Sequence, residues 1–377
     1  MGPLAGVKII ELAGIGPGPF AGMMLADMGA EVISVERKSA AENSKPLPDS
    51  FKRGKRSIAL NLKSKEGIET LFNLISQADV LFEGFRPGVA ERLGIGPDEC
   101  LAKNPKLVYG RMTGWGQFGP LSHSAGHDIN YISLTGALAG IGRVDEKPVP
   151  PLNLVGDFGG GGMFLVAGIL AALFEAEKSG KGQVIDAAMT DGSAVLMSFF
   201  HSMHALGAWS PKPGVNLLDG GAHFYDTYET EDGKYVSIGS IEPQFYALLM
   251  EKAQLDPEIF GDQNNPANWM DLKAKLEIIF KSKTQAEWCE LMEGTDVCFA
   301  PVLDFLEAPN HPHNKARETY IEVDGMVQPA PAPRFSRTVS EVKHGARADG
   351  SDTAAVLSDW GFTDDQVESL KAAGALS

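Results

Sequence analysis

Two side chains that can carry protons stand about thirty residues apart in this chain. His127 follows Gly126 and precedes residues 128–131 (Asp-Ile-Asn-Tyr). Asp157 precedes the glycines 159–162, which lead into an apolar segment. An imidazole and a carboxylate can each remove or return a proton in an enzyme that works near neutral pH. Two different proton carriers near one helix start suggest a reaction in which one group removes a proton and the other returns it.

His127 has three interpretations on residue type alone: a core histidine, a metal ligand or a base. A metal site is disfavoured, because no second histidine lies three or four residues after His127 in the chain, and Asp128 alone makes a poor ligand set. His311 and His313, which Pro312 separates, fit a loop better than a chelate. We therefore expect no metal site, and the core and catalytic interpretations of His127 stay open at this point.

Asp157 and Glu242 are two acidic candidates for the same chemistry. Asp157 is as consistent with a helix N-cap as with a catalytic group, since aspartate is a favoured capping residue. The backbone N–H groups at such a helix start can also hold a developing oxyanion. Glu242 lies far along the chain, in the run 241–245 (Ile-Glu-Pro-Gln-Phe), and is a candidate for orienting His127.

A glycine-rich turn near the N-terminus raises the alternative of dinucleotide binding. Gly14 and Gly16 follow an apolar segment, and Glu36 ends the next one, as in many nicotinamide-binding proteins. However, Pro19 stands where that motif needs its third glycine, and Arg37, directly after Glu36, favours a phosphate. The glycines therefore indicate a tight strand-to-helix turn, and a nicotinamide-dependent dehydrogenase is the weaker reading.

The charge distribution is uneven along the chain. The 377 residues carry a formal net charge of −16, which argues against a nucleic-acid-binding protein. Residues 37–63 nevertheless contain eight basic and two acidic side chains, a local net charge of +6. This segment is either a site for an anion or a solvated loop. Arg86 and Arg92 are further candidates for anion contacts, because guanidinium groups match phosphate oxygens; the alternative is that they are surface arginines.

Cysteine spacing and the apolar runs indicate in which cellular compartment the protein resides. Cys100, Cys289 and Cys298 have unrelated spacings that fit neither a zinc site nor a disulfide framework, so we expect a reducing compartment. The N-terminus does not read as a signal peptide. The longest apolar stretch, 163–174, is shorter than a membrane span and is expected to be a buried helix. We therefore expect a cytoplasmic protein that is not bound to a membrane.

The elements that would position these residues follow from the hydrophobic pattern. Apolar runs predict strands, and segments with helical spacing predict helices, in alternation along the first 110 residues. The predicted strands are 7–12, 31–36, 56–60, 80–85 and 106–112, and the predicted helices are 19–28 and 65–77. This alternation predicts an α/β fold with a doubly wound, mainly parallel, Rossmann-like sheet. We expect two further long helices at 163–178 and 183–206.

The second half of the chain has a different character and predicts a smaller α+β domain. Asp232-Gly233 predicts a hairpin turn between strands at 224–229 and 235–239. Helical patterns follow at 243–253, 270–280, 285–293 and, near the C-terminus, 363–373. We therefore expect a large domain made of 1–185 and 325–377, a linker helix and loop at 186–221, and a small domain at 222–324.

Many short motifs in one order resemble the α-methylacyl-CoA racemase family of the class III CoA-transferase superfamily. They extend over nearly the whole chain, from about Leu4 to Arg337. In chain order they are Arg37-Lys38, Asn61 to Lys63, Glu83 to Gly88, Arg111 to Gln117, Gly126 to Tyr131, Asn153 to Gly161, Gly182 to Met189 and Ile241 to Phe245. Among these, the motifs around His127 and Glu242 favour the racemases over the transferases of the superfamily.

The resemblance implies an interlocked homodimer with a CoA-binding large domain and a small domain. It implies that His127 and Asp157 are the two acid/base groups, and that Glu242 of the partner subunit supports His127. It further implies that the CoA nucleotide and phosphates contact Arg37, Leu60, Lys63, Gly84, Arg86 and Arg92. The pantetheine and thioester are expected at Gly126, Asp128 and Tyr131. Met189, Met197 and Met203, which residue type alone assigns to a core, become candidates for an adaptable acyl-binding surface.

The implied substrate is a 2-methyl-branched acyl-CoA, whose (2R) and (2S) forms are interconverted through an enolate. We expect no metal or organic cofactor, since CoA enters as part of the substrate, and we expect the Asp157 N–H to contribute to an oxyanion hole. The main alternative is a class III CoA transferase that uses Asp157 as a nucleophile. A CoA-binding protein without catalysis would keep Lys63 and Arg86 but would not need His127 and Asp157 together.

Overall fold

The computed structural model describes residues 2–37 and 49–376, which fall into two compact units. Unit 1 consists of Met1–Thr135, Leu152–Leu196 and Glu318–Ser377, and unit 2 of Gly136–Pro151 and Met197–Arg317. The domain boundaries expected at residues 185, 221 and 324 stay a prediction. Lys38 and Lys45 of the basic segment lie outside the described residues.

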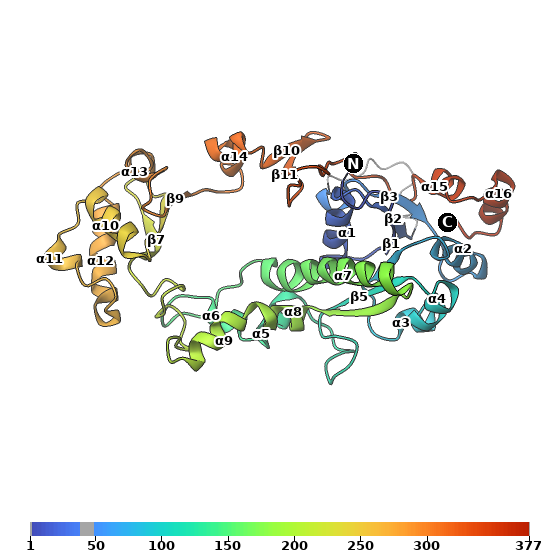
Figure 1. Ribbon diagram of the computed structural model, residues 1–377, viewed down its shortest axis with the longest axis horizontal. Helices are drawn as coiled ribbons and strands as arrows, with labels where there is room; N and C mark the ends of the chain where they lie inside the picture. Colours follow the sequence, from blue (N-terminus) through green and yellow to red (C-terminus); the bar gives the residue numbers. More distant parts are fainter. Residues whose placement is uncertain (1, 38–48, 377) are drawn as a thin grey trace. The chain divides into compact units, whose positions relative to one another are not determined.

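A six-stranded parallel sheet forms the centre of unit 1 (Figure 1). Its strand order is β3-β2-β1-β4-β5-β6, so the order reverses between β1 and β4. The strands are β1 (Lys8–Leu12), β2 (Glu31–Glu36), β3 (Arg56–Ala59), β4 (Val80–Glu83), β5 (Val108–Thr113) and β6 (Gln183–Ala188). This topology confirms the doubly wound, Rossmann-like sheet that the sequence predicts.

Helices cover both faces of this sheet, because neighbouring residues of a strand point to opposite faces. Ile10 packs on one face with side chains of α2 (Lys65–Ile75), α4 (Pro97–Lys103) and α15 (Thr353–Asp359). Ile9 packs on the other face with α1 (Pro17–Asp27) and α7 (Met163–Ser179). Shorter elements of unit 1 are η1 (Ser50–Lys52), α3 (Val89–Arg92), α5 (Asp128–Ser133), the π-helical segment η2 (Leu154–Gly162), α8 (Met189–Leu196) and α16 (Asp364–Ala372).

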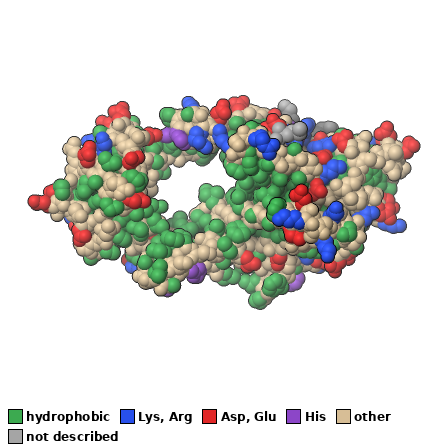
Figure 2. All heavy atoms as spheres, viewed as in Figure 1, with side chains coloured by type: hydrophobic (Ala, Val, Ile, Leu, Met, Phe, Trp, Pro, Cys, Tyr) green, Lys and Arg blue, Asp and Glu red, His purple; other side chains and the backbone are tan. Residues whose placement is uncertain are grey.

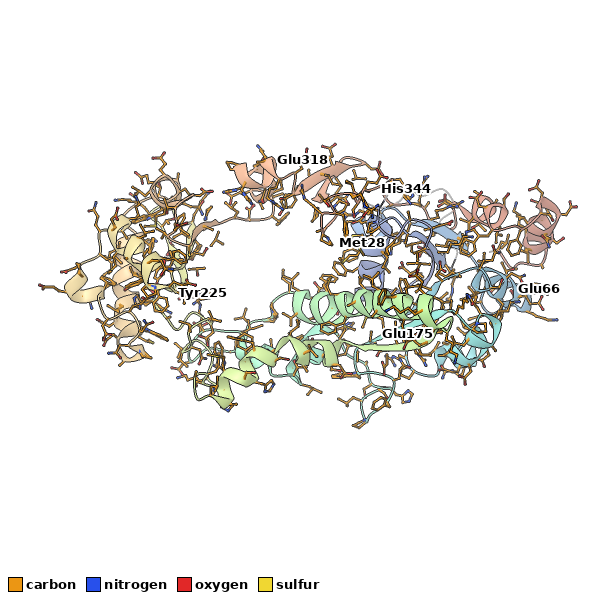
Figure 3. All side chains as sticks on the ribbon, in the orientation of Figure 1. Met28, Glu66, Glu175, Tyr225, Glu318 and His344 are labelled. Atoms are coloured by element: carbon orange, nitrogen blue, oxygen red, sulfur yellow. The ribbon has the colours of Figure 1, made fainter. Side chains whose placement is uncertain are left out.

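The C-terminal segment returns to unit 1, as the sequence predicts. His344 belongs to this segment (Figure 3). Its backbone carbonyl accepts a hydrogen bond from the Gly54 N–H at 2.9 Å. Further along, the Asp352 N–H donates at 2.9 Å to the carbonyl of Ser57, which belongs to the edge strand β3. The segment therefore supplies partners to a strand edge that would otherwise expose unpaired backbone groups.

Acidic and basic side chains are interspersed on the face of unit 1 that Figure 2 shows.

The single helix expected at 183–206 is wrong. The segment folds as β6, then α8, then α9 (Ser198–Ala205). β6 is an edge strand that pairs in parallel with β5, with Val184 opposite Tyr109. β-Branched Val184 and Ile185 suit a pleated strand, and the pairing with β5 supplies the stabilisation that the local sequence pattern does not reveal.

The apolar helical stretch in unit 1 is longer than the sequence predicts. η2 and α7 together form 26 residues, Leu154–Ser179, long and apolar enough to cross a membrane by length and composition. The core helix of a soluble protein meets the same criterion. Leu165 and Ile169 of α7 are fully buried and pack with the sheet residues of unit 1. One face of α7 is therefore part of the core, and the expected lack of a membrane stays a prediction.

Unit 2 contains a three-stranded antiparallel sheet, β7-β8-β9. β7 (Tyr225–Glu229) and β8 (Tyr235–Gly239) form the predicted hairpin, and β9 (Phe299–Val302) completes the sheet. Its core contains the fully buried Tyr228, Phe280 and Trp288. Its helical elements are α6 (Ala137–Gly140), α9, α10 (Pro243–Lys252), α11 (Pro257–Phe260), η3 (Pro266–Asn268), α12 (Trp269–Phe280), α13 (Gln285–Met292), η4 (Ala308–Asn310) and α14 (Pro312–Ala316). A separate hairpin, β10 (Tyr320–Val323) and β11 (Met326–Pro329), belongs to unit 1.

Candidate active site

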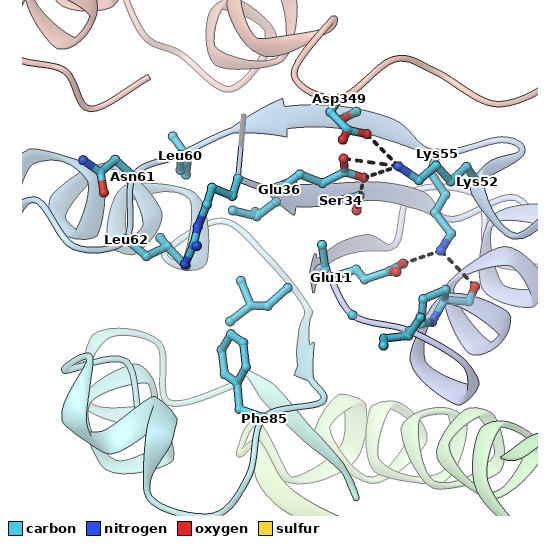
Figure 4. A pocket seen from close by; sticks show the side chains of 18 of the residues that line it. Glu11, Ser34, Glu36, Lys52, Lys55, Leu60, Asn61, Leu62, Phe85 and Asp349 are labelled. Atoms are coloured by element: carbon cyan, nitrogen blue, oxygen red, sulfur yellow. Dashed lines mark hydrogen bonds and ion pairs between the residues drawn. The ribbon is translucent and has the colours of Figure 1, made fainter. Parts of the chain in front are cut away.

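A cavity of about 950 Å³ opens at the carboxyl ends of the central strands of unit 1. We call it the large cavity. Its walls include the segment after β1 (12–15), Glu36 and Arg37 at the end of β2, the segment after β3 (60–63) and Phe85 after β4 (Figure 4). In open parallel sheets, ligands bind where the strand order reverses, and here β1 and β4 are the strands at that point. The large cavity is therefore in the expected place for a ligand.

A second cavity of about 320 Å³, the small cavity, continues from the large one. The two share Gly14, Ile15 and Phe85 in their walls. The small cavity adds His127 and residues from the ends of β4 and β5. Shared walls are consistent with one elongated ligand that has a large head and a narrower reactive end.

The structure brings most of the predicted site residues to these cavities. Those in the large cavity are Arg37, Leu60 and Lys63. Those in the small cavity are Gly84, Arg86, Gly126, His127 and Tyr131. Arg92 shares a neighbouring depression of about 530 Å³ with Lys63. These places are consistent with the predicted contacts, whose roles stay a prediction.

Three predicted residues lie outside the walls of these cavities: Asp128, Glu242 and Asp157, whose surroundings are described below. Asp128 is 8 % exposed and its carboxylate is turned toward the backbone of Asp157. Glu242 belongs to unit 2, where it is the exposed residue before α10, close enough to Cys298 to help raise the pKa of that thiol, after the larger effect of burial. The pairing of Glu242 with His127 is untested by these facts.

His127 is the residue before the first turn of α5, and its side chain is exposed. The backbone N–H of His127 donates to Asn130 Oδ1 at 3.0 Å, and the Tyr131 hydroxyl donates to the backbone carbonyl of Gly126. The ring of Tyr131 packs edge-on against Trp115, with 4.8 Å between ring centroids. The core interpretation of His127 is therefore wrong, because a well-supported turn holds its imidazole at the surface of the small cavity.

Asp157 lies inside η2 rather than at its start. A π-helical segment has wider turns than an α-helix and often marks a functional site. The glycines that follow allow η2 to approach α8: a Cβ at Gly160 would lie 2.4 Å from Ser193 Oγ. Asn153, the residue before η2, donates to Asp157 Oδ2 at 3.1 Å. The N-cap interpretation of Asp157 is therefore wrong, and Asn153 is a site residue that the sequence analysis missed.

Several neighbours act on the ionisation of Asp157. Partial burial raises its pKa above the ordinary value, and the nearby carboxylate of Asp128 raises it further. The hydrogen bond from Asn153 and the positive charge of protonated His127 lower the pKa, but the net direction is upward. Asp157 and His127 therefore interact electrostatically, and the carboxyl is adjusted toward a group that can hold a proton closer to neutral pH.

The expected role of the Asp157 N–H in an oxyanion hole does not fit this structure. That N–H donates to Asp128 Oδ1 at 2.7 Å. A substrate oxygen would have to displace a carboxylate to use it. The start of α5 offers an alternative: the N–H groups of Asn130 and Tyr131 donate to the carbonyl of His127, while those of Asp128 and Ile129 have no partner among the described residues.

Ion pairs line the large cavity, and one of them is buried on both sides. Lys55 Nζ lies 2.5 Å from Glu11 Oε2, and both side chains are 3 % exposed. Lys52 Nζ lies 3.2 Å from Glu36 Oε1 and 2.6 Å from Asp349 Oδ1, which comes from the C-terminal segment (Figure 4). Burial and the adjacent Asp349 raise the pKa of Glu36 to about 7.

Much of the basic segment identified in the sequence is therefore internally neutralised. Arg53 pairs with Asp27 at 2.5 Å, and Arg56 pairs with Glu31 at 3.2 Å. Arg347 of the C-terminal segment adds a cation to the large cavity, and nothing in the local sequence indicates it. The cations that line the cavity without a carboxylate contact among the described residues include Arg37 and Lys63.

Glu36→Gln is expected to flatten the pH dependence of thermal stability between about pH 4.5 and pH 7. The folded-state pKa of Glu36 lies above its ordinary value of 4.5, so the folded state binds an additional proton in that window. The contribution of Glu36 to stability is thus lost as pH rises from 4.5 through 7, and glutamine imitates the protonated form. Melting temperatures measured across this range should fall less steeply in the variant; identical slopes would contradict the assignment.

Comparison with known proteins agrees with the resemblance seen in the sequence. The family model described as CoA-transferase family III matches residues 4–353. The chain is 48% identical to alpha-methylacyl-CoA racemase of Mus musculus over 97% of this chain and 96% of the relative. It is 43% identical to alpha-methylacyl-CoA racemase of Homo sapiens, with the same coverage. A crystal structure of a CAIB/BAIF family protein from Brucella suis superposes with a TM-score of 0.81 at 27% identity, covering 95% of this chain and 99% of that one.

Proposed function

Since the chain belongs to CoA-transferase family III, we propose that it is an isomerase that interconverts the (2R) and (2S) forms of 2-methyl-branched acyl-CoA thioesters. The observation that carries this proposal is the pairing of two different proton carriers at one site. His127 lines the small cavity, and the positive charge of protonated His127 lowers the pKa of the nearby Asp157. Similarity to racemases over 97% of the chain supports the same reaction.

The two connected cavities suit the two ends of an acyl-CoA. The nucleotide and its phosphates occupy the large cavity, where Arg37 and Lys63 supply positive charge, and Arg92 lies nearby. The pantetheine passes Ile15 and Phe85, which both cavities share, and the thioester reaches the small cavity beside His127. Binding energy from the distant nucleotide then holds C2 of the acyl group in place for proton transfer.

In the proposed reaction, neutral His127 removes the proton from C2 and becomes positively charged. The electrons of the broken C–H bond form the enolate of the thioester, and protonated Asp157 donates its proton to the opposite face of C2. For the other enantiomer the two groups exchange roles. The enolate oxygen accepts hydrogen bonds from the N–H groups at the start of α5. No metal or organic cofactor takes part in this scheme, and CoA remains attached to the substrate throughout.

Exchange of the C2 proton tests this function directly. The protein is incubated with one enantiomer of a 2-methylacyl-CoA in D₂O, without any acceptor acid, and is followed by NMR and chiral analysis. Deuterium at C2 together with loss of chirality supports the racemase. Absence of exchange, with CoA transfer once a free acid is added and hydroxylamine labelling of Asp157, would instead establish a CoA transferase.

The proposed assembly is a homodimer in which Glu242 of one protomer supports His127 of the other. The exposure of Glu242 before α10 leaves its carboxylate available to a neighbouring chain. We also propose a cytoplasmic location, which the three free cysteines support. The proposed role is in the metabolism of branched lipids, and it follows from the substrate.

Mixed dimers of His127→Ala and Glu242→Ala chains are expected to regain activity that neither variant has alone. If Glu242 acts across the dimer, each mixed dimer contains one site with both residues intact and one site that lacks both. Co-expressed and tandem-tagged mixed dimers should therefore show up to about half of the wild-type turnover, since one of the two sites is complete. Mixed dimers as inactive as the parent variants would place Glu242 in the site of its own chain or outside the mechanism.

A further inference from the structure

We propose that Asp128 is a positioning residue, whose buried carboxylate fixes the backbone of Asp157 and whose negative charge favours the protonated form of the Asp157 side chain. The inference rests on the proposed racemase function. It assigns Asp128 a role different from the substrate contact implied by the resemblance, because its side chain faces the protein and not the cavity.

The contacts of Asp128 show a carboxylate held beneath Asp157. Oδ1 accepts the Asp157 N–H at 2.7 Å, and the residue is 8 % exposed. Oδ2 is buried and has no hydrogen-bond partner among the described residues. A buried carboxylate oxygen without a donor is costly, and such groups in a folded protein call for an explanation. A structural tether to the Asp157 N–H would need only one neutral acceptor, so the charge itself requires a role.

Gly156 permits this arrangement. A Cβ at Gly156 would lie 2.3 Å from Asp128 Oδ1 and 3.1 Å from Ile132 Cγ2. Real Cβ atoms do not approach oxygen so closely, so a side chain at position 156 would push the carboxylate away from Asp157. The absence of a side chain at Gly156 thus serves the contact between Asp128 and the residue that follows Gly156.

Few other charged groups face Asp157. The residues of α5 and its first turn supply His127 and Asp128, as well as the phenol of Tyr131, whose own pKa is raised first by burial and then by Asp157. η2 supplies the neutral amide of Asn153. The start of α1 approaches through Gly16, where a Cβ would lie 3.3 Å from Asp157 Oδ2.

The other two packed helices, α7 and α8, add no strong influence. The charged residues of α7 lie at its C-terminal end (175–178), away from η2. α8 carries Asp191, which is exposed and is not among the groups that shift the pKa of Asp157. Asp128 is therefore the carboxylate that opposes ionisation of Asp157, whereas His127 and Asn153 favour ionisation.

The opposing effects of these neighbours on Asp157 have a function, because they set the proton affinity of Asp157 relative to that of His127. The resting site holds one proton, on His127 or on Asp157, and each direction of the reaction starts from a different one of these forms. With unperturbed pKa values the form with protonated histidine would be favoured by about 400-fold, from a gap of roughly 2.6 pKa units. In the enolate complex both groups carry a proton. Any group that favours protonated Asp157 therefore stabilises the enolate complex relative to the resting enzyme.

Asp128→Asn tests the charge while keeping the shape and an oxygen acceptor for the Asp157 N–H. We expect kcat/KM to fall by about tenfold for each unit by which the pKa of Asp157 falls. The fall should be equal in both directions, because the equilibrium constant is unchanged. The acidic limb of the pH profile of kcat/KM should move to lower pH, since that limb reports protonation of Asp157 in the free enzyme. Affinity for CoA should stay the same.

Two further variants keep the test decisive. Asp128→Ser also removes the charge but retains an acceptor, and it should move the acidic limb in the same direction. Asp191→Asn removes a carboxylate from α8 without contact to Asp157 and should leave the profile in place. Lower kcat/KM with an unmoved acidic limb in folded Asp128→Asn would overturn the role of the charge. Failure of the wild-type protein to exchange the C2 proton would instead reject the proposed function itself, so the two failures are distinguishable.

Discussion

Replacing either His127 or Asp157 by alanine is expected to abolish racemisation, with turnover falling by at least about 10²–10⁴-fold, the usual contribution of a positioned acid or base. Each group serves one face of C2, so neither can replace the other. CoA affinity should stay near that of the wild type, because the nucleotide contacts lie in the large cavity with Arg37 and Lys63.

The two variants should differ in which enantiomer still exchanges its C2 proton. With Asp157 removed, His127 can still take the proton from the enantiomer that presents it and return a deuteron to the same face. With His127 removed, Asp157 can do the same for the other enantiomer. NMR in D₂O should therefore show exchange with retention of configuration, for opposite enantiomers in the two variants.

Asp157→Asn is a useful companion, because an amide oxygen can still accept the hydrogen bond from Asn153 while the side chain can no longer carry the proton. It should behave as Asp157→Ala does. Turnover like that of the wild type in His127→Ala or in either Asp157 variant would remove that residue from the mechanism. Loss of exchange for both enantiomers in one variant would indicate that its residue has a role beyond a single face.

Local sequence predicts the elements whose stabilisation is mostly local or strongly patterned. Strands β1, β2 and β4 are short apolar runs buried on both faces, so their hydrophobicity is visible in the sequence. β6 is different, since Val184 is 41% exposed at the sheet edge and the strand is defined by its partner β5. The prediction of one helix over 183–206 therefore missed this strand, and only the long-range pairing identifies it.

In the candidate site, too, local motifs are visible in the sequence, whereas long-range contacts are not. Motifs indicate His127 and Asp157 as the two proton carriers, and in the structure the charge of His127 acts on Asp157, but no motif shows that Asp128 turns inward. Asp349 contacts Lys52 from 297 residues away, so no local pattern could reveal it. The count of basic residues also gives no indication of which cations are already paired, as Lys55 is with Glu11.

Lys55→Met is expected to destabilise unit 1 by about 3–5 kcal/mol, the usual cost of removing one partner from a buried ion pair. Lys55 Nζ lies 2.5 Å from Glu11 Oε2 and donates to the carbonyl of Pro19 at 2.9 Å. Methionine leaves the buried Glu11 carboxylate without a counter-charge. Denaturation by urea measures the loss as a shift of the unfolding midpoint.

The loss should depend on pH in a direction that follows from Glu11. Burial raises the pKa of Glu11, and the neighbouring Lys55 opposes that rise. Without Lys55 the folded-state pKa rises further above the unfolded value of 4.5, so the folded state binds a proton over a wider range. Stability of the variant is therefore lost as pH rises, and the difference from wild type should be larger at pH 8 than at pH 5.5.

Removing both charges should cost much less than removing one. The double variant Glu11→Leu with Lys55→Met replaces the pair by apolar side chains, and such replacements are often close to neutral. Lys65→Met is a matched control, because Lys65 and Glu69 form an exposed pair at 3.6 Å on α2, and such pairs contribute about 0.3–0.5 kcal/mol. If the double variant were as unstable as Lys55→Met, lost packing around the lysine stem, rather than the unpaired carboxylate of Glu11, would be the cause.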